Sequence, residues 1–253
     1  MIRQLYDMGL SNIVYYVFQG LGIMAAFLYG IQYRKKYGLS VRKTVILLSV
    51  IFVAVYIWTF AHFLIETGFT GIGTTSIYRA LPYLLLIAWP VSALVKVKWE
   101  TICDFMAPLM SLSVGISLFG CAFAGCCEGY PSTWGIYNVR YGGFAFPVQI
   151  FEAMTLLIIF VFLLWWNKQH KYNSNGKSYP IMLMLFGSTR FLWEFARNNE
   201  KIWIGCSALS FHALFMLIVG LDAFFTIQEK EKQKGKKIER FIRNPKKIRS
   251  RSK

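Results

Sequence analysis

Three charged residues in one apolar stretch have the types and spacing to bind an anion. In the stretch FGSTRFLWEFARNNE, Arg190 and Glu194 are four positions apart and Arg197 follows three positions later. Residues at these spacings share one face of a helix, and the guanidinium fork can bind two phosphate oxygens at once. An ion pair satisfied within the helix is the simpler interpretation. One carboxylate between two guanidiniums leaves a positive charge uncompensated, however, and this favours an anionic ligand such as phosphate.

A second polar pair, Gln149 and Glu152, follows Pro147 at the start of another apolar stretch. Ionisable side chains inside an apolar span are unfavourable, so each one needs a partner or a function. The two side chains could hydrogen-bond across to a neighbouring helix. Alternatively, Glu152 is the ion-pair partner of one of the two arginines.

Residues 104–131, DFMAPLMSLSVGISLFGCAFAGCCEGYP, begin like a membrane span and end rich in small residues. Small residues at four- and five-residue spacing let two backbones approach each other, or let a chain leave helical geometry around a bound molecule. We therefore expect part of the site here. For Asp104, near the start of the stretch, a charge stabilised by the helix dipole is favoured over a catalytic role. The glycines and cysteines concerned are Gly120, Cys121, Gly125, Cys126, Cys127 and Gly129.

The cysteines themselves predict neither a disulfide framework nor a metal centre. Their total of five is odd, and the C-x4-C-C spacing of Cys121, Cys126 and Cys127 matches no standard zinc pattern. Small thiols that fill a tight helix crossing are the favoured interpretation. We predict no metal ion and no cofactor.

The elements that must position these residues are long apolar blocks. The chain has 253 residues, 56% of them hydrophobic, which is more apolar surface than a soluble domain can bury. A helix needs roughly 20 residues to cross about 30 Å of hydrocarbon. The sequence therefore predicts an all-α, polytopic membrane protein with seven transmembrane helices. Their approximate ranges are 11–33, 44–65, 78–95, 102–126, 147–166, 179–195 and 208–227.

The basic residues predict the orientation of these helices. Most of the 28 Lys and Arg lie in alternate connections, at 34–43, 96–98 and 168–177, and after position 228. The positive-inside rule then places the N-terminus outside and the C-terminus in the cytoplasm. We expect two parts, a membrane domain at 1–227 and a basic cytoplasmic tail at 228–253. The net charge of +16 reflects this asymmetry and a tail lying on anionic lipid, and does not indicate nucleic acid.

The connection at 128–146 has few charges and many aromatic and glycine residues. This composition suits a loop on the outer lipid headgroups, where a lipid or a tethered polypeptide enters. The chain shows no inverted pair of broken spans, which argues against a transporter.

Taken in order, these residues resemble the bacterial prolipoprotein diacylglyceryl transferase family. The 104–132 stretch resembles its D-x-x-A-P segment, its G-R-x-G-N-F signature and the following G-x-x-x-G-x-P-T. FPVQIFEA resembles R-H-P-S-Q-L-Y-E, and FGSTRFLWEFAR resembles Y-G-x-x-R-x-x-x-E-x-x-R. LSFHA at 209–213 takes the place of an L-S-M-G-Q-like stretch, and VYYVFQGLG places Tyr15 at the family's first-span tyrosine.

The resemblance implies transfer of the diacylglyceryl group of phosphatidylglycerol to the lipobox cysteine of a secreted lipoprotein precursor. It implies a bacterial plasma membrane protein whose partners are this or another anionic phospholipid and the precursor. Arg190 and Arg197 would clamp the phosphate and Glu194 would orient them. The remaining substrate-binding residues implied are Tyr15, Asp104, Gly120, Gly125, Gly129 and Gln149.

The chain departs from the family pattern where the family has polar residues. The signature arginine and asparagine fall on Leu118 and Cys121. An acidic residue falls on Cys126, with Glu128 as a substitute nearby, and the family's H-G-G has no counterpart. A general base is typically worth about 10²–10⁴ in rate, so Glu128 or Glu152 would have to replace a lost histidine. A non-catalytic relative that binds lipid or precursor, or a related phospholipid-headgroup enzyme with another acceptor, are the alternatives.

Overall fold

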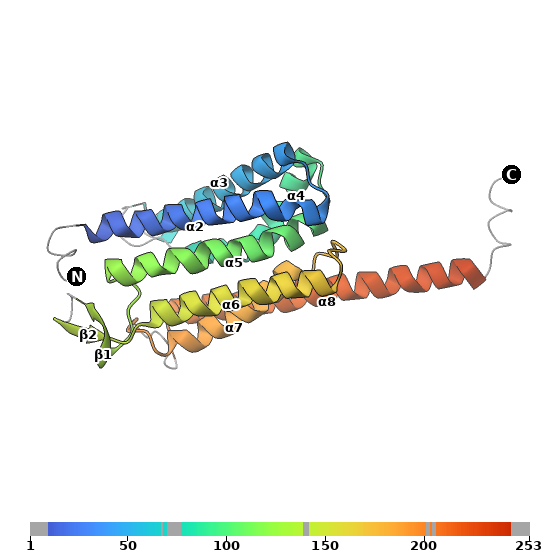
Figure 1. Cartoon of the computed structure of the whole chain (residues 1–253). Coiled ribbons are helices and arrows are strands. Elements are labelled where there is room, and N and C mark those ends of the chain that lie inside the picture. Colours follow the sequence, from blue (N-terminus) through green and yellow to red (C-terminus); the bar gives the residue numbers. More distant parts are fainter. Residues whose placement is uncertain are drawn as a thin grey trace.

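The computed structural model describes residues 10–66, 68–69, 77–138, 142–200, 203 and 206–243. Helices dominate the described chain, and they lie side by side in a bundle (Figure 1). The helices are α2 (Ser11–Tyr33), α3 (Val41–Glu66), α4 (Leu84–Val95), α5 (Trp99–Ala124), α6 (Val148–Gln169), α7 (Ser178–Glu194) and α8 (Ala208–Arg243), with short 3-10 turns η1 (Arg34–Tyr37) and η2 (Ile77–Arg79).

Five of these helices, α2, α3, α5, α6 and α8, are long and apolar enough to cross a membrane. The chain is therefore a mostly helical, polytopic membrane protein. The predicted block at 78–95 is not one continuous helix, because η2 and a run of turns precede α4, which has only 12 residues. Pro82 lies in those turns, where its missing N–H interrupts no helical hydrogen bond.

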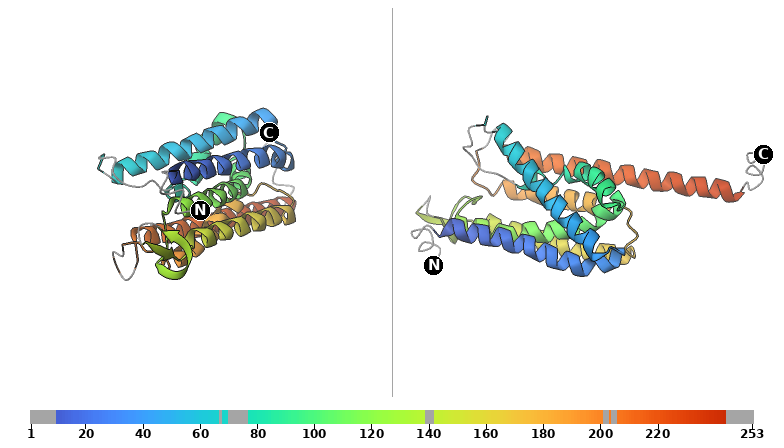
Figure 2. Two further views of the ribbon diagram at one scale, coloured as in Figure 1. Left: turned by 60° about the vertical axis from the view of Figure 1, so that its left-hand side comes forward. Right: turned by 90° about the horizontal axis from the view of Figure 1, so that it is seen from above.

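Helix α5 forms the centre of the bundle. Of its most apolar window, 83% is buried, whereas the corresponding share is 17% in α2 and 22% in α8. It packs between α2 on one side and α6 and α7 on the other (Figures 1 and 2). Large apolar side chains such as Ile13, Val53 and Ile158 point outward from the other helices, as contact with lipid requires.

Helices α2 and α5 cross with almost no space between their backbones. A Cβ on Gly120 would lie 3.0 Å from the carbonyl oxygen of Tyr15, and one on Gly22 would lie 2.4 Å from that of Ser113. The predicted backbone approach at Gly120 is confirmed. Gly22 makes an even closer approach, which the sequence analysis did not single out.

We expect Gly22→Ala to lower the free energy of unfolding by about 1–3 kcal/mol, as overpacking does. The added methyl group meets a backbone oxygen, which moves only if the helices separate. Gly20→Ala is the matched control, since a Cβ there would have nothing within 4 Å. Thermal unfolding of the purified protein in detergent measures both variants, and equal melting temperatures would contradict the prediction.

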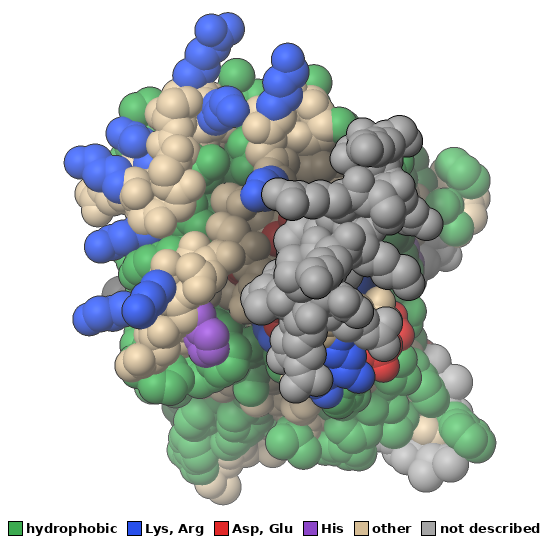
Figure 3. Space-filling model, turned by 90° about the vertical axis from the view of Figure 1, so that its right-hand side faces the viewer, with side chains coloured by type: hydrophobic (Ala, Val, Ile, Leu, Met, Phe, Trp, Pro, Cys, Tyr) green, Lys and Arg blue, Asp and Glu red, His purple; other side chains and the backbone are tan. Residues whose placement is uncertain are grey.

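The basic connections gather at one end of the bundle. Lys43 Nζ donates to the carbonyl of Lys96 at 3.2 Å, and Lys177 pairs with Glu231 at 2.5 Å. The view onto this end shows Lys and Arg side chains around it (Figure 3). Helix α8 passes the predicted boundary at 227 without a break and projects beyond the bundle as far as Arg243 (Figure 1). Residues 244–253 of the predicted tail lie outside the described residues.

The opposite end carries the only strands of the described chain. Strand β1 (Pro131–Asn138) pairs antiparallel with β2 (Gly143–Ala145), with Tyr137 opposite Phe144. The all-α prediction therefore needs correction, because part of the aromatic segment at 128–146 forms a hairpin. The backbone groups of the two strands hydrogen-bond to each other. Aromatic side chains such as Trp134 and Phe144 are exposed on the hairpin.

Candidate functional site

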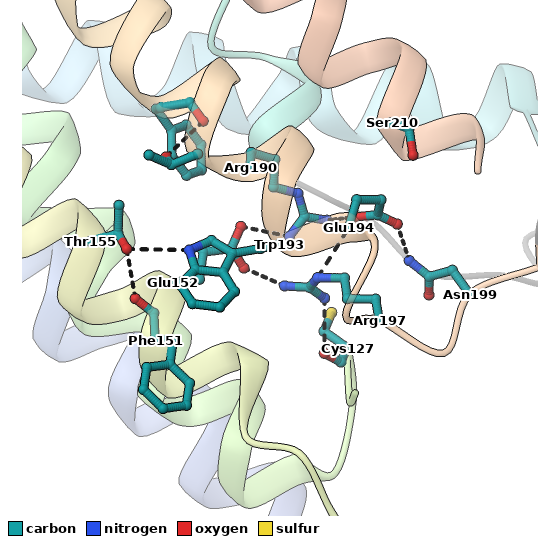
Figure 4. Close-up of polar contacts among 12 residues, drawn as sticks. Cys127, Phe151, Glu152, Thr155, Arg190, Trp193, Glu194, Arg197, Asn199 and Ser210 are labelled. Atoms are coloured by element: carbon teal, nitrogen blue, oxygen red, sulfur yellow. Dashed lines mark hydrogen bonds and ion pairs between the residues drawn. The ribbon is translucent and has the colours of Figure 1, made fainter. Parts of the chain in front are cut away.

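Four buried ionisable side chains meet near the hairpin end of the bundle (Figure 4). Arg190 and Glu194 come from α7, Glu152 comes from α6, and Arg197 follows the end of α7. Arg190 is 2% exposed and the other three are 0% exposed. The structure thus brings together the charged residues that the sequence singled out in two separate stretches.

Each carboxylate of this cluster contacts both guanidiniums. Arg190 Nη1 lies 2.6 Å from Glu152 Oε1, and its Nη2 lies 3.2 Å from Glu194 Oε2. Arg197 pairs through Nη2 with Glu152 Oε2, and its Nε lies 3.7 Å from Glu194 Oε2. The prediction that Arg190 and Glu194 share a helical face is confirmed, whereas Arg197 lies beyond the end of α7 and reaches the same carboxylates from outside the helix.

The predicted charge imbalance is wrong for this cluster. Two guanidiniums face two carboxylates, so the four groups cancel formally. Spacing along one helix counts only Glu194, whereas Glu152 enters from α6 and pairs with both arginines instead of one. Buried charges are tolerated only when they are paired and hydrogen-bonded, and this arrangement meets that requirement.

Further contacts hold Glu194 and Arg197 in place. Ser207 Oγ donates to Glu194 Oε1 at 2.7 Å, and Asn199 Nδ2 donates to the same oxygen. Arg197 Nη1 donates to the carbonyl of Cys127 at 2.9 Å. The guanidinium of Arg197 is therefore tied to the chain that follows α5 as well as to the carboxylates.

Backbone pairing with residues 128–130 fixes the position of Arg197 along the chain that follows α7. The N–H of Tyr130 donates to the carbonyl of Ala196 at 3.3 Å, and that of Asn198 donates to Glu128 at 3.2 Å. Gly129 lies opposite Arg197 in this pairing. A Cβ on Gly129 would lie 2.6 Å from the carbonyl oxygen of Phe146, so the close approach requires glycine here.

A cavity of about 540 Å³ opens beside the cluster, between α2, α5 and the end of α7. Of the predicted site residues, Arg190, Arg197, Tyr15 and Glu128 line it. Glu152 does not, because it lies behind the two arginines. The other lining residues are Asn12, Tyr16, Gln19, Tyr78, Arg79, Val114, Ser117, Leu118, Cys121, Ala124, Cys126, Cys127, Asn198, Asn199 and Leu209.

Tyr78 and Arg79 are the main site residues that sequence reasoning missed. The guanidinium of Arg190 lies over the ring of Tyr78, 4.7 Å from its centre, a favourable cation–π geometry. His212 Nε2 lies 3.1 Å from the carbonyl oxygen of Tyr78. Position 78 begins one of the membrane spans predicted from the sequence. An adjacent aromatic residue and arginine shortly before Pro82 are the signal that could have identified both residues.

Three predicted residues shape the cavity wall without lining it. Gly120 packs against α2, and Gly125 ends α5 with a left-handed φ of 65°. Gln149 Nε2 donates to the carbonyl of Cys126 at 2.7 Å. These three residues therefore determine the path of the backbone around the cavity.

Asp104 lies at the basic end of the bundle, away from the cavity. It is 17 positions before Cys121 in α5, or about 25 Å along the helix at 1.5 Å per residue. Its carboxylate accepts hydrogen bonds from the N–H groups of Gly176 and Ser178, both at 2.8 Å. These contacts tie the α6–α7 connection to α5, so the structure does not bring Asp104 to the predicted substrate site.

The three cysteines at the end of α5 form part of the cavity wall. The sulfur atoms of Cys121, Cys126 and Cys127 all lie within 4.8 Å of one another. The pKa of Cys127 is lowered well below its ordinary value, because hydrogen bonds from the other two thiols and the charges of Arg197 and Arg190 outweigh burial. This is the group of described residues whose donor atoms could hold a metal ion.

Comparison with known proteins points to one family. The family model described as prolipoprotein diacylglyceryl transferase matches residues 4–226. Phosphatidylglycerol–prolipoprotein diacylglyceryl transferase 2 of Clostridium perfringens is 30% identical over 50% of this chain and 52% of its own length. The corresponding enzyme of Clostridium tetani is 27% identical over 51% and 55%, and that of Dehalococcoides mccartyi strain 195 is 26% identical over 66% of each. The match to the two clostridial relatives spans about half their length.

Proposed function

This chain belongs to the prolipoprotein diacylglyceryl transferase family, and we propose that it transfers the diacylglyceryl group of phosphatidylglycerol to a precursor cysteine. The acceptor is the thiol of a lipobox cysteine in a secreted lipoprotein precursor. The observation that carries the proposal is that two buried guanidiniums, those of Arg190 and Arg197, meet in the wall of one cavity.

Arg190 can serve an anion while it stays ion-paired. It contacts Glu152 through Nη1 and Glu194 through Nη2, and a guanidinium has five N–H donors. The two carboxylates and the ring of Tyr78 hold the fork in one orientation before lipid arrives. Donors fixed in advance towards developing charge are the most effective form of electrostatic stabilisation.

The proposed reaction is a displacement at the glycerol carbon that bears the phosphate. The acceptor thiolate forms the S–C bond, the C–O bond to phosphate breaks, and glycerol phosphate leaves with the electron pair. The charge on the departing phosphate is stabilised by Arg190 and Arg197. Glu128 is better placed than Glu152 to accept the thiol proton, since Glu128 lines the cavity and both oxygens of Glu152 contact guanidiniums.

The proposal includes the arrangement in a bacterial inner membrane. Helices α4 and α7, with their flanking turns, complete a set of seven spans. The basic end of the bundle lies in the cytoplasm, in keeping with the positive-inside rule, and the hairpin end with the N-terminus lies outside. The cavity then opens at the level of the outer leaflet, where a secreted precursor is accessible.

We expect the purified protein, in bilayer discs that contain phosphatidylglycerol, to convert a lipobox peptide into its diacylglyceryl thioether. Mass spectrometry of the peptide and assay of released glycerol phosphate measure the two products. A peptide with serine in place of cysteine is the control for the acceptor, and discs of phosphatidylethanolamine are the control for the donor. Products formed in equal amount from both lipids would contradict the assigned donor.

The formal neutrality of the charged cluster favours one alternative, a non-catalytic relative that binds lipid or precursor. None of the described residues that line the cavity is a histidine, which is the most frequent general base of enzymes. This alternative predicts that phosphatidylglycerol raises the melting temperature while no thioether forms. Transfer to an acceptor other than a cysteine peptide would instead indicate a related phospholipid-headgroup enzyme, and a protein without binding or transfer would contradict every version.

A further inference from the structure

The three cysteines at the end of α5 are gathered by an unusual turn. Gly125 ends α5 in the left-handed region, and Cys127 has a φ of 58° in the same region. A residue other than glycine or asparagine is strained there by about 1–2 kcal/mol. The N–H of Cys126 donates to the carbonyl of Cys121 at 3.2 Å, so the turn folds the second and third thiols back towards the first.

The interpretation of these thiols as filling for a helix crossing does not account for the space beside them. All three line the cavity of about 540 Å³, and Cys121 is at the same time buried in the apolar core. Cys126 and Cys127 are only partly buried. Sulfur atoms that converge on an open space have a geometry suited to a ligand.

We propose that Cys121, Cys126 and Cys127 form a binding site for a thiophilic metal ion, Zn²⁺, with one coordination position open to the cavity. Zinc–sulfur bonds are about 2.3 Å long, so three ligands of a tetrahedral site stand about 3.8 Å apart. The sulfur atoms already lie within 4.8 Å of one another. Small rotations of the side chains close this difference, and the cavity leaves room for them.

Side chains from other elements hold the backbone of two of the three ligands. Gln149 Nε2 donates to the carbonyl of Cys126 at 2.7 Å, and Arg197 Nη1 donates to that of Cys127 at 2.9 Å. Outer partners that orient the ligands are typical of metal sites. Three thiolates and one Zn²⁺ carry a net charge of −1, and Arg79, a cation outside the formally neutral cluster, lines the same cavity.

Three protein ligands with an open fourth position are the arrangement of catalytic zinc sites, whereas structural sites have four protein ligands. If the proposed transfer holds, the ligand suited to the open position is the acceptor cysteine, bound as thiolate. This part rests on the proposed function. The metal site itself does not, because metal binding can be measured whether or not transfer occurs.

The test is a Co²⁺ titration of the purified, fully reduced and metal-free chain in detergent. The visible spectrum of Co²⁺ reports coordination geometry and thiolate ligands. We expect one equivalent to bind with tetrahedral, thiolate-rich absorption, and Zn²⁺ to displace it. Cys126→Ser is expected to weaken binding at least about 100-fold, because even loss of an outer partner costs about 10–100-fold. Cys206→Ser is the matched control, since Cys206 is also partly buried and lies outside the cluster.

Several results would overturn the site. One is a reduced, folded protein that gives no thiolate–cobalt absorption, and another is equal binding by the Cys126→Ser and Cys206→Ser variants. A third is a disulfide within the cluster whose reduction restores no binding.

A lipobox peptide is then added to the cobalt-loaded protein, and we expect its cysteine form, but not its serine form, to change the spectrum. An unchanged spectrum would overturn the open position.

Discussion

Arg190→Lys is expected to lower the rate of diacylglyceryl transfer about 100- to 1,000-fold, the effect of losing one preorganised donor at a developing charge. Lysine keeps the positive charge but is a point charge on a flexible stem. It cannot contact Glu152 and Glu194 through two rigidly linked nitrogens above the ring of Tyr78, as Arg190 does. The fork orientation is therefore lost although the formal charge of the cluster is kept.

Arg34→Lys is the matched control, because Arg34 lies at the basic end of the bundle and donates to the carbonyl of Leu39 at 3.1 Å. We expect its transfer rate to stay within about twofold of the unsubstituted protein, because Arg34 is half-buried at the end of the bundle opposite the cavity and does not line it. Rates are compared at saturating phosphatidylglycerol, with melting temperatures recorded to exclude unfolding. If Arg190→Lys transfers at the full rate, the fork is not the phosphate ligand and the clamp assignment is wrong.

Glu152→Gln is expected to lower the free energy of unfolding by about 3–5 kcal/mol, the effect of breaking a buried ion pair. The change preserves shape but removes the charge that both arginines share, and Glu152 is 0% exposed. One buried positive charge then lacks compensation. Urea or thermal unfolding in detergent measures the loss, and Glu100→Gln, a carboxylate near the opposite end of α5, is the control.

The double variant Glu152→Gln, Arg190→Gln separates charge from packing, because it restores formal neutrality. We expect it to be more stable than Glu152→Gln alone, which gives the non-additivity that coupled groups show in a double-mutant cycle. Phosphatidylglycerol is also expected to raise the melting temperature of Glu152→Gln more than that of the unsubstituted protein. Strictly additive losses would show that the charges do not act as one group.

Most of the long helices could be predicted from the sequence, because unbroken apolar blocks of membrane length have few alternatives. The prediction of one helix over 78–95 was wrong for a local reason. The turns that contain Pro82 occupy the first part of the block and leave only the short helix α4. The hairpin was missed because its aromatic residues suit a headgroup loop equally well. The helical continuation of α8 follows from strong helix formers such as Glu229 and Lys230, which the prediction treated only as charges.

The site could be predicted only as far as contacts within one element. The spacing of Arg190 and Glu194 predicts a shared helical face, which α7 has, whereas Arg197 lies just beyond the helix and still contacts Glu194. Nothing in that spacing shows that Glu152 from α6 bonds both arginines, which reverses the charge argument. The convergence of the cysteines was equally hidden, because it depends on left-handed backbone at Cys127 and not on the intervals between the residues.

Because residues 128–130 pair with residues 196–198 through their backbones, the position of the Arg197 guanidinium depends on the number of residues in the segment after α7. Arg197 lies opposite Gly129, between the bonds made by Ala196 and Asn198. Side chains along an extended chain alternate between its two sides, so a slip of one residue presents a neighbour in place of Arg197. A single-residue deletion between 195 and 200 would therefore exchange a guanidinium for a methyl or an amide. The number of residues in this segment therefore determines where the guanidinium lies, in addition to the residue types.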